Sequence, residues 1–283
     1  MKFFEKFKKK KEQPQQPEAA SQPAAAPVPN TSLTVFFDRA DVGQEEIAAA
    51  IREKFGAEAV SSVDSSRPSV THFMLRIDGM DAVCSYMPFP YPQEECNIPA
   101  LMQVNHFIAE EEQRALVEHK SFCVLAEIGG GKTLAGKRAV CLMLTKLCAS
   151  LLGVAGAAGA CCAAASLLLG KRMYLNYAAI CEREEKDPEY FPSILWVLAY
   201  QTRADDGAPT VETCGLAQFG FMELQFYNPK EDWANSYEKL YLMAILEITG
   251  RDLYKNRDTI SFTQDSVSVF KQSGEKLSVI GGI

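Results

Sequence analysis

The sequence predicts an α+β fold built from two ferredoxin-like halves, each with a mixed or antiparallel sheet and packed helices. Three observations predict this class: strands with apolar alternation, helices with apolar residues on one face, and short alternating segments near the carboxyl end. In the first part the elements follow the order β-α-β-β-α-β, which is that of the ferredoxin-like unit. We expect a disordered basic tail over residues 1–31 and one domain over residues 32–283, with pseudo-halves of about 32–130 and 131–283.

Composition is that of an ordinary globular protein, with 47% hydrophobic and 23% charged residues among 283. The net charge of −7 is unevenly distributed. Residues 1–31 carry six lysines against three glutamates, so the tail has a charge of about +3 and the rest about −10. Because an acidic body repels phosphate backbones, we expect no nucleic-acid partner.

The nine cysteines are odd in number and contain no C-x-x-C pair. We expect them to be small core residues of a reducing compartment, which predicts a cytoplasmic location. A zinc site needs cysteines and histidines clustered at ligand spacing, and His72, His106 and His119 are the only histidines. We therefore expect no metal, no cofactor and no catalytic residues. A cysteine and a histidine that meet only in the folded chain stay open as a catalytic pair.

The first eleven residues, MKFFEKFKKKK, place Phe3, Phe4 and Phe7 on one side of a short helix with lysines around it. Proline and alanine dominate the run that follows, to about Asn30. One interpretation is a solvated tail on a flexible linker. The other is contact of residues 1–11 with a membrane surface through three aromatic rings and a polybasic patch. A secretory signal is not expected, because no apolar core follows the basic start.

The first half begins with a strand over residues 33–38. Asp41 and Gln44 form a capping box for the next helix, which ends at Gly56. A hairpin follows, with strands over 71–77 and 81–87 and a turn at Asp78-Gly79. Next, Asn97 caps a helix that runs to His119, and residues 122–126 form a buried strand.

Three glycines follow this strand, and a long apolar helix opens at Lys132 and Thr133. Strand, glycine turn and helix form the layout of a phosphate loop, whose backbone N–H groups surround the phosphates. The full pattern needs a glycine at position 126, and the residue there is Ala126. We therefore expect a structural turn. The alternatives are a nucleotide- or anion-binding enzyme, or a looser anion site at the helix N-terminus, each using Gly129, Gly130, Gly131, Lys132 and Thr133.

No charged residue occurs between Lys146 and Lys171, which is the length of a membrane span. Three glycines interrupt this segment, so we expect residues 147–170 to lie in a soluble core, as a turn followed by a small-residue strand or helix. The remaining expected elements are a helix from Lys171, strands over 194–200, 211–214 and 221–227, a helix over 233–248, and an antiparallel set of strands over 259–263, 267–270 and 277–280.

Three stretches resemble the bacterial domain of unknown function 4261 family. They are residues 87–92 (MPFPYP), residues 119–147 from His-Lys-Ser-Phe through the glycine turn to Leu-Met-Leu-Thr-Lys-Leu, and residues 215–224 together with 258–262. The resemblance covers roughly residues 33–280. The family pattern has a second histidine where this chain has Phe122, and its glycine turn is usually not followed by Lys-Thr. The resemblance implies a cytoplasmic bacterial α+β domain, with a short Phe/Lys-rich start in many relatives and no established activity.

The acidic body, the lack of a convergent catalytic set and the short strands at the carboxyl end favour a non-enzymatic protein-binding module. Such a module would neutralise or accompany a secreted bacterial effector, and its protein partner is not identified by the sequence. The two alternatives are the nucleotide- or anion-binding enzyme and the peripheral membrane protein described above.

Overall fold

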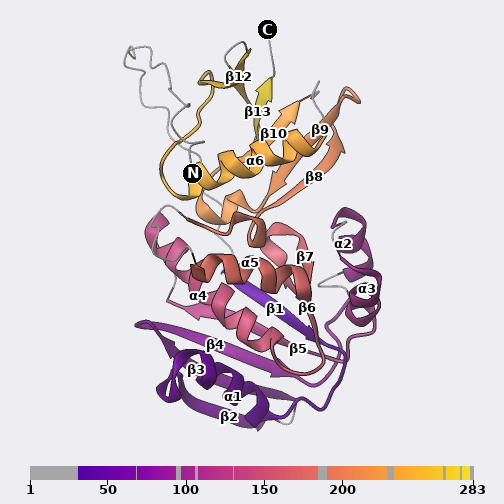
Figure 1. Cartoon of the computed structure of the whole chain (residues 1–283), viewed down its shortest axis with the longest axis vertical. Helices are drawn as coiled ribbons and strands as arrows, with labels where there is room; N and C mark the ends of the chain where they lie inside the picture. The colour runs from indigo at the N-terminus through magenta and orange to yellow at the C-terminus, as the bar shows by residue number, and fades with distance from the viewer. Residues whose placement is uncertain are drawn as a thin grey trace.

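The computed structural model describes residues 31–67, 69–93, 97–105, 108–129, 131–183, 190–227, 233–263, 266–274 and 276–280. The predicted membrane-contact residues Phe3, Phe4 and Phe7 lie outside this part of the chain, as do His106 and Gly130. Two sheets follow one another along the long axis of the molecule, with helices packed against both (Figure 1). The α+β class predicted from the sequence is confirmed.

The first sheet has seven strands in the order β2-β3-β4-β5-β1-β6-β7. Every neighbouring pair within it is antiparallel. A split β-α-β unit contains a parallel pair joined by a helical crossover, so this sheet does not confirm a ferredoxin-like first half. The strands are β1 (Ser32–Phe37), β2 (Val60–Arg67), β3 (Val70–Ile77), β4 (Met80–Met87), β5 (Ser121–Ile128), β6 (Ala157–Cys162) and β7 (Leu167–Gly170).

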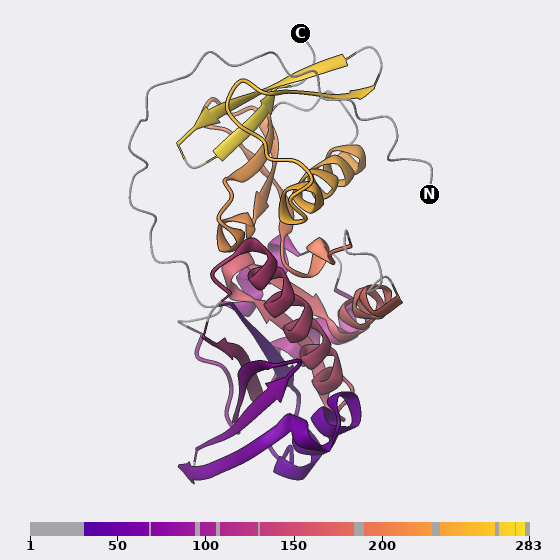
Figure 2. The same ribbon diagram turned by 90° about the vertical axis from the view of Figure 1, so that its left-hand side faces the viewer.

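Helices cover this sheet on two faces. One face carries α1 (Gln44–Phe55), α4 (Leu134–Leu152) and α5 (Lys171–Arg183), and the other carries α2 (Ile98–Val104) and α3 (Glu110–Val117). Successive side chains of β1 point to opposite faces of the sheet. Val35 packs in the larger of two buried hydrophobic clusters, and Phe36 packs in the smaller one on the other face. Figure 2 shows α4 lying along the sheet. Residues 97–119, expected as one helix, form two, and the side chain of Asn97 caps the first as predicted.

Strand β2 was not expected from the sequence. Its residues VSSVDSSR are exposed apart from Val60, so they lack the apolar alternation that marks a half-buried strand. The segment is a strand because it pairs with β3 at the edge of the sheet. The predicted hairpin after it is confirmed: Asp78 and Gly79 have φ of 51° and 80°, the two positive values of a tight hairpin turn.

The segment 147–170 completes α4 and then supplies β6 and β7. Small residues suit this place because both sheet faces here are covered, and all six residues of β6 are buried. A Cβ atom at Gly159 would collide with the carbonyl oxygen of Leu169 on β7. No helix in the described part of the chain is long and apolar enough to cross a membrane.

The second sheet has the order β11-β12-β13-β10-β9-β8, and it is mixed because β13 pairs with β10 in parallel. The helix α6 (Trp233–Ile248), predicted from its apolar stripe, packs against this sheet (Figure 1). The strands are β8 (Leu198–Arg203), β9 (Pro209–Cys214), β10 (Glu223–Tyr227), β11 (Thr259–Thr263), β12 (Ser266–Ser273) and β13 (Lys276–Ile280).

The strand expected over 194–200 begins only at Leu198. Residues 193–195 form a 3₁₀ turn instead, because the carbonyl of Ser193 accepts hydrogen bonds from the backbone N–H groups of Trp196 and Val197. The turn places Trp196 in one buried cluster with residues of both sheets. The boundary between the sheets lies between Gly170 and Leu198, so it does not coincide with the pseudo-half boundary predicted near residue 130.

Glu112, on α3, caps the beginning of α5 through a hydrogen bond. Its carboxylate accepts a hydrogen bond of 2.8 Å from the backbone N–H of Arg172, in the first turn of α5, where a negative charge also meets the positive end of the helix dipole. We expect Glu112→Ala to lower the free energy of unfolding by about 1 kcal/mol, as for the loss of an N-cap. Urea unfolding measures the effect. Glu111→Ala is the matched control, because Glu111 is exposed, and an equal loss in both variants would contradict the assignment.

Candidate functional site

The glycine turn is tightly packed against its own helix. Gly129 has φ of 120° at the end of β5, where only glycine is comfortable. A Cβ atom at Gly131 would lie 2.5 Å from the backbone carbon of Gly136, so the turn touches the first turn of α4 directly. Lys132 and Thr133 are exposed, and the Thr133 hydroxyl accepts a hydrogen bond of 3.1 Å from the N–H of Gly136. Thr133 is thus the N-cap of α4.

This geometry bears on the predicted anion site. In a phosphate loop the hydroxyl after the lysine reaches magnesium, whereas here the Thr133 hydroxyl serves its own helix. Strand β5 continues through Ala126 to Ile128 and is antiparallel to both neighbours. A turn that connects strand to helix accounts for these features. Anion binding by Gly129, Gly130, Gly131, Lys132 and Thr133 stays a prediction.

Substitution at Thr133 separates these two interpretations. We expect Thr133→Ala to lower the free energy of unfolding by about 1 kcal/mol because the cap is lost, and Thr133→Ser to keep most of it. Urea unfolding gives both values. We also expect magnesium ATP to leave the melting temperature of the wild type unchanged. A rise that Lys132→Ala abolishes would instead establish a nucleotide site, since a ligand of the native state stabilises it by mass action.

Both ring nitrogens of His119 form hydrogen bonds within the protein. Nδ1 lies 2.8 Å from the carbonyl oxygen of Leu116 and donates to it, while Nε2, 2.8 Å from the backbone nitrogen of Tyr91, accepts its N–H. The neutral ring therefore ties the proline-rich segment after β4 to the end of α3. Burial is the main cause that lowers the pKa of His119 below its ordinary value of 6.5. A general base needs a free nitrogen, and this ring has none.

The pKa of His119 predicts a pH dependence. Because the folded value is depressed, the unfolded chain binds the proton more readily, and stability falls as pH falls. The contribution is complete above about pH 6.5, the unfolded value, and is lost progressively below it. We expect the stability difference between the wild type and His119→Gln to shrink between about pH 8 and pH 5. Urea unfolding at each pH measures it, and a constant difference would contradict the role.

The described cysteines that the structure places as free thiols are mostly buried in the core. Burial raises the pKa of Cys148 and of Cys162 to about 12, so both stay protonated and unreactive. Among the described residues no group of three or more His, Cys, Asp or Glu side chains could hold a metal ion.

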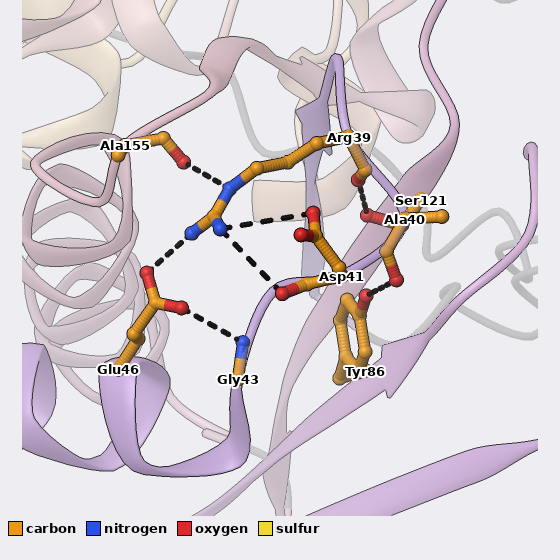
Figure 3. A network of polar contacts seen from close by, with 8 residues as sticks. All are labelled: Arg39, Ala40, Asp41, Gly43, Glu46, Tyr86, Ser121 and Ala155. Carbon is orange, nitrogen blue, oxygen red and sulfur yellow. Dashed lines mark hydrogen bonds and ion pairs between the residues drawn. The ribbon is translucent and has the colours of Figure 1, made fainter.

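A network of polar contacts joins the loop after β1 to α1 and to the α4–β6 connection (Figure 3). The guanidinium of Arg39 binds the Glu46 carboxylate and donates from Nε to the carbonyl of Ala155 at 3.1 Å. Glu46 also accepts the N–H of Gly43 at 3.1 Å, which is the one half of a capping box that a glycine N-cap allows. The capping box predicted for Asp41 and Gln44 is wrong, because Gly43 is the N-cap and Gln44 is the first residue of α1. The network joins the loop after β1 to the α4–β6 connection, and the charges of Arg39 and Glu46 pair with each other.

The second sheet presents a different arrangement on the face opposite α6. Val211 and Phe226 point into the core, so the residues next to them point the other way. Tyr200, Glu212, Gln225 and Ser278 lie in one row there, because Tyr200 is opposite Glu212, Glu212 is opposite Gln225, and Gln225 is opposite Ser278. We call this row, across β8, β9, β10 and β13, the polar ladder. Since α6 lies in front of β9 and β10 in Figure 1, the ladder faces away from the viewer.

Hydrogen bonds run along the polar ladder and converge on Glu212. The Ser278 hydroxyl donates to the Gln225 amide oxygen at 2.8 Å, and the Gln225 amide nitrogen donates to the Glu212 carboxylate. Tyr200 donates to Glu212 at 3.2 Å, and Lys276 does so at 2.6 Å. Glu212 is only 3% exposed, so these three donors replace the water that a carboxylate otherwise requires. Burial, with Glu212 beside it, raises the pKa of Tyr200 to about 12, which keeps its hydroxyl a donor.

Above the ladder is an open pocket of about 720 Å³. Glu212, Gln225 and Ser278 contribute to its lining, and a turn between β8 and β9 forms one end of it. Its charged lining residues are Arg203, Asp205, Asp206, Glu212, Lys271 and Lys276. This pocket is the candidate functional site, and none of these residues was predicted from the sequence. The alternation of polar residues at 210–212, 223–227 and 276–278 is the signal, but only the strand register brings the three segments together.

The comparisons with known proteins add no relative to this picture. No family model matches the chain, and neither a curated protein nor a solved structure matches it.

Proposed function

We propose that the protein is a non-enzymatic protein-binding module and that the pocket over the polar ladder is its binding surface. The observation that carries the proposal is the buried Glu212, whose carboxylate is held by three side-chain donors at the floor of an open, charged pocket. A carboxylate so fully bonded is a poor general base, because its lone pairs are engaged. It is well suited to hold a binding floor in one geometry.

The composition of the pocket supports a polar partner. Small-molecule sites of this volume are mostly apolar, with a few placed polar groups. Here charged and amide side chains form the lining, and Lys271 and Lys276 are exposed at the rim. Rims of this kind are typical of contacts between proteins, where complementary charges select the partner.

The wider identity rests on the sequence alone. Membership of the domain of unknown function 4261 family, a bacterial origin, a cytoplasmic location and association with a secreted effector stay predictions. They agree with a binding module, because such a protein needs a recognition surface and no catalytic centre.

The test is affinity capture from the native host with two baits besides the wild type. Lys271→Glu reverses a charge at the pocket, and Lys120→Glu reverses an exposed lysine outside its lining. We expect a protein captured by the wild type and by Lys120→Glu to be lost with Lys271→Glu. A partner retained equally by all three baits, or no partner at all, would sink the proposal.

A further inference from the structure

The charges of the pocket differ in how far the protein itself satisfies them. Lys276 is paired with Glu212, and Asp206 accepts hydrogen bonds from the Tyr227 hydroxyl and from the N–H of Ala208. Arg203 donates to the carbonyl oxygen of Gly207 at 3.0 Å. Within the part of the chain that the structure describes, the side chains of Lys271 and Asp205 have no hydrogen-bond or ion-pair partner, and both residues are exposed. One cation and one anion are thus available to a ligand.

The two available charges lie at opposite ends of the pocket. Asp205 belongs to the turn that joins β8 to β9. Lys271 lies on β12, opposite Ser278, and Lys276 is its diagonal neighbour on the same face, since Ser273 is opposite Lys276. The pocket is therefore negative at the β8–β9 turn and positive over β12 and β13. Its six charged lining residues balance to zero, so a ligand of one sign gains at one end and is repelled at the other.

The distance between the ends selects the kind of ligand. From β9 to β12 the sheet order is β9-β10-β13-β12, which is three strand spacings or about 14 Å. Along the strands, Asp205 lies beyond the pair of Arg203 with Pro209, whereas Lys271 lies in the row of Glu212, three residues or about 10 Å further along β9. The two charges are therefore at least about 17 Å apart. A free amino acid carries its charges too close together to reach both ends. An extended chain covers about 14 Å in four residues, and long charged side chains at its two ends reach the remainder.

Resting on the proposed function, we infer that the pocket binds an extended peptide segment of the partner that carries an acidic and a basic side chain about four residues apart. The acidic side chain binds Lys271, and the basic one binds Asp205 in the β8–β9 turn. The polar ladder lies between them and supports the peptide without supplying a charge of its own, because Glu212 is already paired.

The experiment uses the full chain, labelled with ¹⁵N, and blocked synthetic peptides. Glu-Thr-Ser-Thr-Lys has its charges four residues apart, and Thr-Ser-Glu-Lys-Thr has the same composition with adjacent charges. We expect the first to shift the amide signals of pocket residues and to bind about fivefold more tightly than the second, the factor of one additional exposed ion pair. Equal affinities, or shifts confined to residues outside the pocket, would overturn the inference.

A charge exchange provides the second arm. We expect Lys271→Glu to prefer Lys-Thr-Ser-Thr-Lys over Glu-Thr-Ser-Thr-Lys, reversing the preference of the wild type, while Lys120→Glu keeps the original order. An unchanged preference in Lys271→Glu would refute the contact. If the peptides fail while the captured partner still depends on Lys271, the ligand class is wrong and the proposed function stands. If the partner is indifferent to Lys271, the proposed function itself fails.

Discussion

Trp196→Ala is expected to lower the free energy of unfolding by about 3–5 kcal/mol, the usual cost of removing a large buried ring. Trp196 is fully buried, and its indole N–H donates to the Thr145 hydroxyl of α4 at 2.9 Å. Its carbonyl accepts the Gln218 amide at 2.9 Å. The side chain belongs to the one buried cluster that contains residues of both sheets, so the cavity would open where they meet. Urea unfolding measures the loss.

Trp233→Ala is the matched control, because it removes the other tryptophan, which is 36% exposed at the beginning of α6. We expect its effect to stay within about 0.5 kcal/mol, as for most surface changes. Trp196→Phe keeps an aromatic ring and loses the bond to Thr145, so it should fall between the two. Similar losses for Trp196→Ala and Trp233→Ala would show that Trp196 does not join the sheets.

Glu212→Ala is expected to lower the free energy of unfolding by about 2–4 kcal/mol. The substitution leaves the buried Gln225 amide and the half-buried Tyr200 hydroxyl without their acceptor, and a buried unsatisfied donor costs about 1–3 kcal/mol. The loss of the Lys276 pair adds little, because the Lys276 side chain is about half exposed and solvent screens its charge. Thermal and urea unfolding measure the sum.

Two further variants show whether the polar ladder acts as a unit. Glu212→Gln keeps the shape and one acceptor oxygen, so we expect a smaller loss than for Glu212→Ala. Asp205→Ala removes an exposed carboxylate from the same pocket and should change stability by less than about 0.5 kcal/mol. A loss for Asp205→Ala as large as that for Glu212→Ala would mean that the pocket charges, rather than the buried acceptor, determine stability.

The sequence correctly predicted the elements that are determined by residues close together along the chain. Asp78-Gly79 predicted its hairpin, Thr133 marked the start of α4, and the apolar stripe of α6 gave its length, because turn conformation, capping and helical period act over a few residues. Strand β2 was missed because its partner, and not its own composition, makes it a strand.

The candidate site could not be predicted either, because it depends on the pairing of several strands and not on the composition of any one of them. Glu212, Gln225 and Ser278 are each ordinary polar residues in short strands, and their meeting depends on which strands pair and in which register. The parallel pairing of β13 with β10 was not foreseen, since the sequence indicated only an antiparallel set of strands at the carboxyl end. Without that pairing there is neither a polar ladder nor a pocket.

The position of β13 also determines when the second sheet can form during protein synthesis. Strand β13, the last strand in the described part of the chain, lies in the interior of the second sheet, between β12 and β10. During synthesis, β8, β9 and β10 leave the ribosome well before β13 is made. One edge of β10 therefore stays unpaired until β13 has been synthesised. The pocket over the polar ladder therefore assembles only after residues 276–280 have been synthesised, because Lys276 and Ser278 of β13 belong to its lining.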